Sequence, residues 1–263
     1  MISSQYISRI VLQRDKVESF EEYPFSLPSV RALDYIEPHP KVTFFVGENG
    51  SGKSTLLEAI AISMGFNPEG GTKNFRFGTR ASHSILHEYL LIAKGYKRPR
   101  RGFFLRAESF FNMATEIEHL DAEPDDPSPP VIGYYGGQSL YEQSHGESFM
   151  TLLMKRFGDN GLYLLDEPEA ALSPQRQLEA LARIHDLASA KSQFIIATHS
   201  PILMAYPDAW IYQFTKDGVS KVAYQDTEHY QVTRSFLMNP ERMPKELMNN
   251  ERQPSSVKNN NRE

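Results

Sequence analysis

The stretch that most constrains the fold is a glycine-rich loop, GENGSGKST, at residues 47–55. It matches the pattern G-x-x-x-x-G-K-[ST] and stands between a nearly all-apolar segment, 41–47, and a segment whose apolar residues have helical spacing. Glycines let the backbone turn its N–H groups inward, and the start of the next helix adds a dipole that favours anions. We therefore expect a phosphate-binding loop formed by Gly47, Glu48, Asn49, Gly50, Ser51, Gly52, Lys53, Ser54 and Thr55.

Two residues of this loop have distinct expected roles in an ATP site. The ammonium group of Lys53 can reach the β and γ phosphates, and the Ser54 hydroxyl can ligate Mg²⁺. The alternative is a glycine turn with an incidental lysine, which the order of strand, loop and helix disfavours. ATP and Mg²⁺ are accordingly the expected cofactors.

A pair of acids follows a second buried strand, LYLLDE, at residues 162–167. An acid at the carboxyl end of a parallel strand lies near the phosphate loop in sheets of this class. Asp166 is then a ligand of Mg²⁺, directly or through water, and Glu167 the general base that polarises the attacking water. The alternative is a helix cap or a surface pair of acids.

A histidine ends a further buried strand in QFIIATHSP. A single histidine at such a place is more often structural than catalytic. Together with Lys53 and Glu167, we expect His199 to donate a hydrogen bond to the γ-phosphate or to the attacking water.

The segment EQSHGESFM at residues 142–150 superficially suggests a hydrolase, because a serine, a histidine and a glutamate lie within four positions. Adjacent residues are poor candidates for a catalytic triad, whose three groups must align in space. The pattern G-x-S-x-G also fails, since its fifth position is Met150. A hydrolase of this type is therefore excluded.

The order of these motifs resembles that of the ATP-binding cassette (ABC) ATPase family. The segment QSHGE occupies the place of that family's L-S-G-G-Q signature, with Gln143 for the leucine and His145 for the first glycine. The resemblance implies that Ser144 and Gly146 contact the γ-phosphate bound by a second subunit, in an ATP-dependent head-to-tail homodimer. The run from RAESFF to ATHSPILMAYP is closest to small stand-alone bacterial predicted ATPases.

The resemblance also implies roles for residues outside these motifs. Glu108 occupies a plausible place for a ligand to a metal-bound water; the alternative is an acid at a helix N-cap. Tyr23 and Phe25 are candidates for stacking on adenine. Ser173 replaces the aspartate that is usual in the loop crossing the dimer interface.

Strands alternate with helices along most of the chain, which predicts an α/β fold with a mainly parallel central sheet. The resemblance adds a P-loop NTPase core of the ABC cassette type, an N-terminal antiparallel β element and a helical subdomain. We expect one domain over residues 1–240, with a helical lobe at about 80–158, and a flexible polar tail at 241–263. Residues 84–95 are expected to form a helix that ends at Gly95.

Composition narrows the function further. The 263 residues include no cysteine, which excludes disulfides and zinc–thiolate sites, and the net charge of -5 gives no overall attraction to nucleic acid. A local basic stretch, KGYKRPRR at 94–101, is either a contact for nucleic-acid phosphates or a solvated loop, which we favour. No secretory signal or membrane span is apparent, so a cytoplasmic protein without direct membrane insertion is expected.

Three functions remain open at this point. The loop sequence is more like the RecF/SMC branch of soluble ATPases, which suggests an ATP-driven switch in DNA repair, chromosome maintenance or defence, acting on nucleic acid or a partner protein. The chain is alternatively the nucleotide-binding subunit of an ABC transporter with a separate membrane partner. The third reading is a nucleic-acid sensor in which ATP controls dimerisation with negligible turnover.

Overall fold

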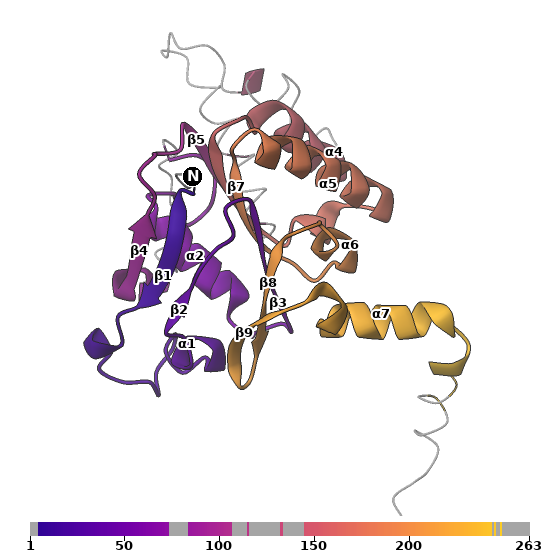
Figure 1. Cartoon of the computed structure of the whole chain (residues 1–263), viewed down its shortest axis with the longest axis horizontal. Coiled ribbons are helices and arrows are strands. Elements are labelled where there is room, and N and C mark those ends of the chain that lie inside the picture. Colours follow the sequence, from indigo (N-terminus) through magenta and orange to yellow (C-terminus); the bar gives the residue numbers. More distant parts are fainter. Residues whose placement is uncertain are drawn as a thin grey trace, which may run out of the picture.

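The computed structural model of the chain describes residues 5–73, 84–106, 115, 132–133, 145–243, 245 and 248. Two sheets and the helices around them make up this part of the molecule (Figure 1). Each of the two sheets pairs strands that are far apart in the sequence, so the sheet topology decides which motifs lie close together.

The central sheet has six strands in the order β5-β6-β7-β3-β8-β9. The first five strands in this order run parallel, and β9 pairs antiparallel with β8. The prediction of a mainly parallel sheet is therefore confirmed. The six strands of the central sheet are β3 (Val42–Gly47), β5 (Arg101–Arg106), β6 (Gly161–Asp166), β7 (Gln193–Ala197), β8 (Trp210–Thr215) and β9 (Gly218–Val222).

The smaller sheet is antiparallel and has the order β2-β1-β4, which confirms the expected N-terminal β element. Its strands are β1 (Ile7–Leu12), β2 (Tyr35–Ile36) and β4 (Leu90–Lys94). The predicted helix over 84–95 is wrong: a 3-10 turn, η2 (Ile85–Tyr89), leads directly into β4. A short apolar run fits either structure locally, and pairing with β1 decides for the strand.

The two faces of the central sheet carry separate hydrophobic cores. On β3, Val42, Phe44 and Val46 point into one core, and Phe45 points into the other. The first core contains α4 (His145–Thr151), the π-helical turn η4 (Leu152–Arg156), α5 (Pro174–Ser189) and α6 (Pro201–Met204). The second contains α2 (Lys53–Ser63), which lies between the two sheets, and α1 (Pro28–Arg31). The uniform burial of β3 follows from this covering of both faces.

One buried amide joins the two sheets. Gln193, fully buried at the start of β7, accepts hydrogen bonds from the backbone N–H groups of Tyr6 and Ile7, both at 2.9 Å. Its amide nitrogen donates to the carbonyls of Ile7 and His39 at 2.9 and 3.0 Å. All four hydrogen-bonding positions of this side chain are thus used, so the N-terminal sheet is held in register with the central one.

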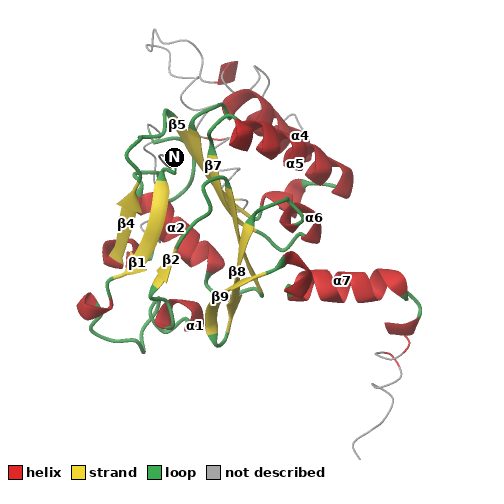
Figure 2. Ribbon diagram, in the orientation of Figure 1, coloured by secondary structure: helices red, strands yellow, loops and turns green. Residues whose placement is uncertain are grey.

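The remaining described elements are short, apart from the last helix. They are η1 (Arg14–Lys16), η5 (Pro168–Ala171), η6 (Tyr224–Asp226) and α7 (Glu228–Met238). Figure 2 shows α7 extending from the body of the molecule, and none of its residues is buried. Its first turn is held by Thr227, a fully buried N-cap whose hydroxyl accepts from the Tyr230 N–H and donates to the Tyr224 carbonyl.

About half of the expected helical lobe and most of the expected polar tail lie outside the described residues. Within the lobe, 84–106 form η2, β4 and β5, and 145–156 are helical. Strands β8 and β9 form an antiparallel hairpin joined at Lys216 and Asp217. The division into one domain and a tail stays a prediction.

Candidate functional site

The glycine-rich loop joins β3 to α2, as the sequence predicts. Lys53 begins α2, is 3% exposed, and its ammonium group donates to the carbonyls of Gly47 at 2.9 Å and Glu48 at 2.8 Å. The side chain thus folds back across the loop. Gly52 has a φ of 94°, and a Cβ there would lie 2.4 Å from the Ser29 hydroxyl, so no other residue fits.

Burial lowers the pKa of Lys53. The nearby carboxylates of Glu167, Asp166 and Glu169 oppose this shift and favour the charged form. A partly desolvated ammonium group is suited to bind an anionic ligand, because the negative charge of the ligand would replace the hydration that the group has lost.

The loop and the acidic strand end meet as predicted. The hydroxyl of Ser54 donates to Asp166 Oδ1 at 2.9 Å, although β6 is separated from β3 by β7 in the sheet. Asp166 pairs in register with Ala197 of β7, which in turn pairs with Phe45 of β3, so the carboxyl ends of the strands share one edge. A hydroxyl and a carboxylate oxygen side by side are suited to Mg²⁺, which prefers oxygen ligands.

Glu167 has an unusual backbone conformation. Its φ and ψ of 50° and 51° are left-handed, which costs a residue with a side chain about 1 kcal/mol. The backbone is held there by its N–H, which donates to the Ala197 carbonyl at 2.9 Å, and by the following Pro168 that opens η5. This turn directs a partly exposed carboxylate towards His199, with 3.4 Å between Glu167 Oε1 and His199 Nε2.

His199 is fixed by two further contacts. Its backbone N–H donates to Glu169 Oε1 at 2.5 Å, and its Nδ1 lies 3.1 Å from Nε2 of His229 in the first turn of α7. Burial is the main cause that lowers the pKa of both rings, and the positive charge of Lys53 lowers them further. Burial also raises the pKa of Glu169, while the hydrogen bond from His199 opposes that shift.

The structure therefore brings together Lys53, Ser54, Asp166, Glu167 and His199, and it adds two residues that the sequence analysis missed. Glu169 lies two positions after the predicted base, so its place in the acidic turn was a usable signal. His229 lies 30 positions after His199 in a segment without a motif, and no local pattern singles it out.

The signature segment is described only from His145 onward, so Ser144 lies outside the described residues. Gly146 is in the first turn of α4, as expected, and it is buried within its own chain. A Cβ at this position would lie 2.6 Å from the Ala171 carbonyl, so close packing of α4 on η5 already requires glycine. Arg176 of α5 also contacts α4, with 3.4 Å between its guanidinium group and the carboxylate of Glu147.

The other candidate residues from the sequence differ in where they lie. Glu108 lies outside the described residues. Tyr23 is 63% exposed, with its hydroxyl 3.4 Å from that of Thr55, whereas Phe25 is 5% exposed and packs edge-on against Tyr89. Of the two aromatic candidates, only Tyr23 can meet a ligand at the loop. The basic stretch forms the end of β4, a loop and the start of β5, and its charged residues Lys94, Lys97, Arg98, Arg100 and Arg101 are exposed.

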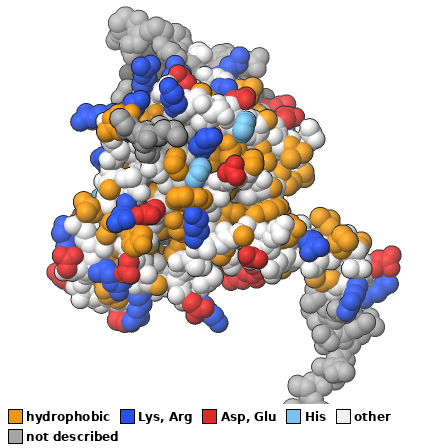
Figure 3. All heavy atoms as spheres, viewed as in Figure 1, with side chains coloured by type: hydrophobic (Ala, Val, Ile, Leu, Met, Phe, Trp, Pro, Cys, Tyr) orange, Lys and Arg blue, Asp and Glu red, His pale blue; other side chains and the backbone are white. Residues whose placement is uncertain are grey.

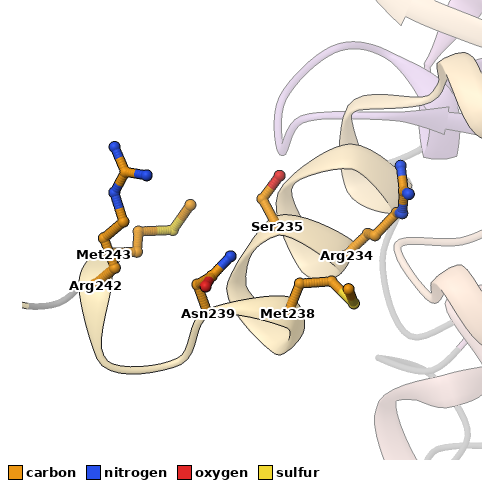
Figure 4. Close-up of a pocket in the computed structure, with 6 residues that line it drawn as sticks. All are labelled: Arg234, Ser235, Met238, Asn239, Arg242 and Met243. Atoms are coloured by element: carbon orange, nitrogen blue, oxygen red, sulfur yellow. The ribbon is translucent and has the colours of Figure 1, made fainter.

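Surface hollows elsewhere are distinct from this site. Figure 4 shows one at the outer end of α7, formed by Arg234, Met238 and the turn that follows the helix. Another, of about 510 Å³, lies between α5, α6 and α7 and is lined mainly by apolar side chains such as Leu181 and Leu237. Hydrophobic side chains gather on α7 and on the body next to it in Figure 3.

Comparison with protein families places both halves of the site in known domains. A model described as "AAA domain" matches residues 20–104, and one described as "AAA domain, putative AbiEii toxin, Type IV TA system" matches residues 132–205. The first match contains the phosphate loop, and the second contains the acidic strand end and His199. With the loop geometry described above, these two AAA-domain matches make the chain a P-loop ATPase.

Solved structures with a similar fold to this P-loop ATPase include three of modest likeness. An Smc head bound to the C-winged helix domain of ScpA is 15% identical, with 72% of this chain and 92% of that chain covered and a TM-score of 0.41. The ADP conformation of MJ1267, a cassette of an ABC transporter, is 18% identical over 89% and 96%, with a TM-score of 0.46. The SMC head domain from Thermotoga maritima is 16% identical over 82% and 98%, with a TM-score of 0.39.

Comparison with curated protein sequences gave no match for this P-loop ATPase. Among the residues that the structure describes, none of the helices combines the length and the hydropathy of a bilayer-crossing segment.

Proposed function

We propose that this P-loop ATPase is of the ABC type, binds Mg-ATP at the glycine-rich loop and hydrolyses it in the cytoplasm. The observation that carries the proposal is the direct contact between Ser54 and Asp166, with Glu167 and His199 at the same edge of the sheet. These groups lie at or just beyond the ends of three separate strands, β3, β6 and β7, and neither a chance glycine turn nor a helix cap accounts for their convergence.

The loop's own groups bind the phosphates. Lys53, which now donates to two carbonyls of the loop, is expected to donate to β and γ phosphate oxygens instead. Ser54 and Asp166 would hold Mg²⁺, which supplies charge neutralisation when bound. Tyr23, exposed beside Thr55, is the aromatic residue placed to stack on the base.

The acidic turn supplies the base. The carboxylate of Glu167 accepts a proton from the attacking water, and its left-handed backbone directs it towards His199. His199 Nε2 lies next to this carboxylate and donates a hydrogen bond to the water or to the terminal phosphate as charge develops.

We further propose that the site is completed by a second copy of the chain, whose Ser144 and Gly146 contact the terminal phosphate. The place of this segment supports the arrangement, because α4 is described from His145 onward and backbone N–H groups at a helix start favour an anion. The packing of Gly146 on Ala171 gives the glycine a role within its own chain, so the trans contact depends on Ser144 and on the backbone. Closure of the dimer would then drive a conformational change in a partner.

Replacing Glu167 with glutamine tests the assignment. Glu167→Gln is expected to bind ATP with the wild-type affinity and to hydrolyse it at least about 100-fold more slowly, because the amide cannot accept the proton from water. Steady-state phosphate release and equilibrium binding of a fluorescent ATP analogue measure the two quantities. Glu179→Gln, an exposed change on α5, is the matched control.

Normal turnover in Glu167→Gln would refute the role of the base, and absence of ATP binding in the wild type would refute the proposed function. Turnover of the wild type measured with and without duplex DNA, single-stranded DNA or RNA then tests a nucleic-acid partner. The five exposed basic residues of the 94–101 stretch are the surface on which such stimulation would depend.

A further inference from the structure

The contact between two histidines beside the acidic turn has no role in the mechanism described so far. His199 Nδ1 and His229 Nε2 are 3.1 Å apart, and the ring planes make an angle of 61°. One ring follows β7, and the other belongs to the first turn of α7. The contact therefore links the catalytic edge of the sheet to the last described helix.

A neutral histidine carries one N–H donor and one acceptor nitrogen, so a bond between two neutral rings has two possible directions. Either His229 donates to His199, or His199 donates to His229. Both rings are half-buried, and burial together with Lys53 lowers the pKa of each, which favours the neutral forms. The direction must then be set by what the other nitrogen of His199 faces.

That nitrogen, Nε2, faces Glu167. It lies 3.4 Å from Glu167 Oε1 without hydrogen-bond geometry, and the negative charge of a carboxylate at this distance favours an N–H over a lone pair on Nε2. The N–H of His199 therefore belongs on Nε2. Its Nδ1 must then be the acceptor, so the N–H between the rings belongs to His229.

The first turn of α7 is rigid enough to hold this donor. Thr227 caps it and is fully buried, and the Thr227 hydroxyl bonds to both the Tyr230 N–H and the Tyr224 carbonyl. The charges that face the His229 ring come from three elements: Lys53 of α2, Glu48 of the phosphate loop and Glu228 of α7 itself. No described residue other than His229 contacts His199 Nδ1.

We propose that His229 is a positioning residue for His199. Its Nε2–H donates to His199 Nδ1 and so fixes the tautomer whose Nε2–H serves the phosphate or the attacking water. The inference rests on the proposed function, because the benefit of this tautomer lies in ATP hydrolysis. It extends that function to α7, whose first turn becomes part of the catalytic apparatus.

Two substitutions separate positioning from mere packing. His229→Met removes the donor and keeps an apolar side chain of similar length, whereas His229→Gln keeps an N–H donor near the position of Nε2. His185→Met is the control, because His185 Nδ1 contacts the Tyr206 hydroxyl at 3.2 Å on α5, away from the site.

His229→Met is expected to lower kcat for ATP hydrolysis roughly tenfold, the loss typical of removing a residue that orients a functional histidine. Affinity for ATP should stay within about twofold, because His229 acts only through His199, whose hydrogen bond matters as charge develops during hydrolysis. His229→Gln should keep most of the wild-type kcat, and His185→Met all of it. Equal losses of kcat in His229→Gln and His229→Met, or no loss in His229→Met, would overturn the proposal.

The tautomer itself is measured without turnover. Long-range ¹⁵N–¹H spectra of the full chain labelled in histidine distinguish protonated from unprotonated ring nitrogens, and the His199→Ala and His229→Met variants assign the signals. Nδ1 of His199 should be unprotonated and Nε2 protonated in the wild type, and this preference should weaken in His229→Met. A protonated Nδ1 in the wild type would overturn the proposal.

The two measurements can refute the proposed function and the role of His229 separately. A wild-type chain that binds no ATP or does not hydrolyse it would refute the proposed function, and the spectra would still decide the tautomer. A chain that hydrolyses ATP with His199 protonated on Nδ1 would keep the proposed function and refute the role of His229.

Discussion

At the scale of single residues, the site depends on side chains held in one direction by partners outside the motif. Glu169 accepts the backbone N–H of His199, and His229 contacts its ring, so both the position and the tautomer of His199 are set from elsewhere. The sequence predicted Lys53, Asp166 and His199 as site residues, because each belongs to a short local motif. It did not predict His229, since a partner that is brought near by packing leaves no spacing to recognise.

The two neutral histidines make stability depend on pH. The pKa of each ring is lower in the folded chain than the ordinary value of 6.5, so the unfolded chain binds more protons as pH falls through that region. Stability is expected to be fully present above about pH 7.5 and to decrease towards pH 5.

In His229→Gln one titrating ring is lost, and the pKa of His199 is no longer lowered by the charge on that ring. Urea unfolding at successive pH values should show a shallower decrease for His229→Gln, and an unchanged slope would contradict the pairing.

At the scale of elements, burial explains both the correct and the wrong sequence predictions. Strand β3 is covered on both faces, and its uninterrupted apolar run allowed it to be predicted. The segment that forms β4 has alternating contact with solvent and an apolar run that also fits a helix, so only its pairing with β1 reveals the strand. The local sequence does not reveal α7 either, because this helix has no buried residue and no motif.

The joint between the sheets provides a test at this scale. Gln193→Met would leave the N–H groups of Tyr6 and Ile7 without their acceptor in a fully buried place. The free energy of unfolding is expected to fall by about 2–4 kcal/mol, because each unsatisfied buried group costs about 1–3 kcal/mol. Gln175→Met, an exposed change on α5, should alter it by less than about 0.5 kcal/mol. Urea unfolding measures both, and a loss below about 1 kcal/mol in Gln193→Met would show that the amide does not join the sheets.

At the scale of the whole molecule, one edge of the central sheet collects the phosphate loop, the acidic turn, His199 and the first turn of α7. The N-terminal sheet and the helices of the opposite face hold this edge in place through separate cores. A nucleotide bound there would face outward, towards a second copy. Assembly of the ATPase is therefore expected to depend on ATP.

The most direct test of this account is the mass in solution of Glu167→Gln with and without Mg-ATP, measured by light scattering after size exclusion. The account predicts a monomer without nucleotide and a stable dimer with Mg-ATP, because binding is retained and hydrolysis is blocked. The double variant Lys53→Ala, Glu167→Gln should stay monomeric in both conditions. A Glu167→Gln chain that binds Mg-ATP and remains a monomer would contradict the account.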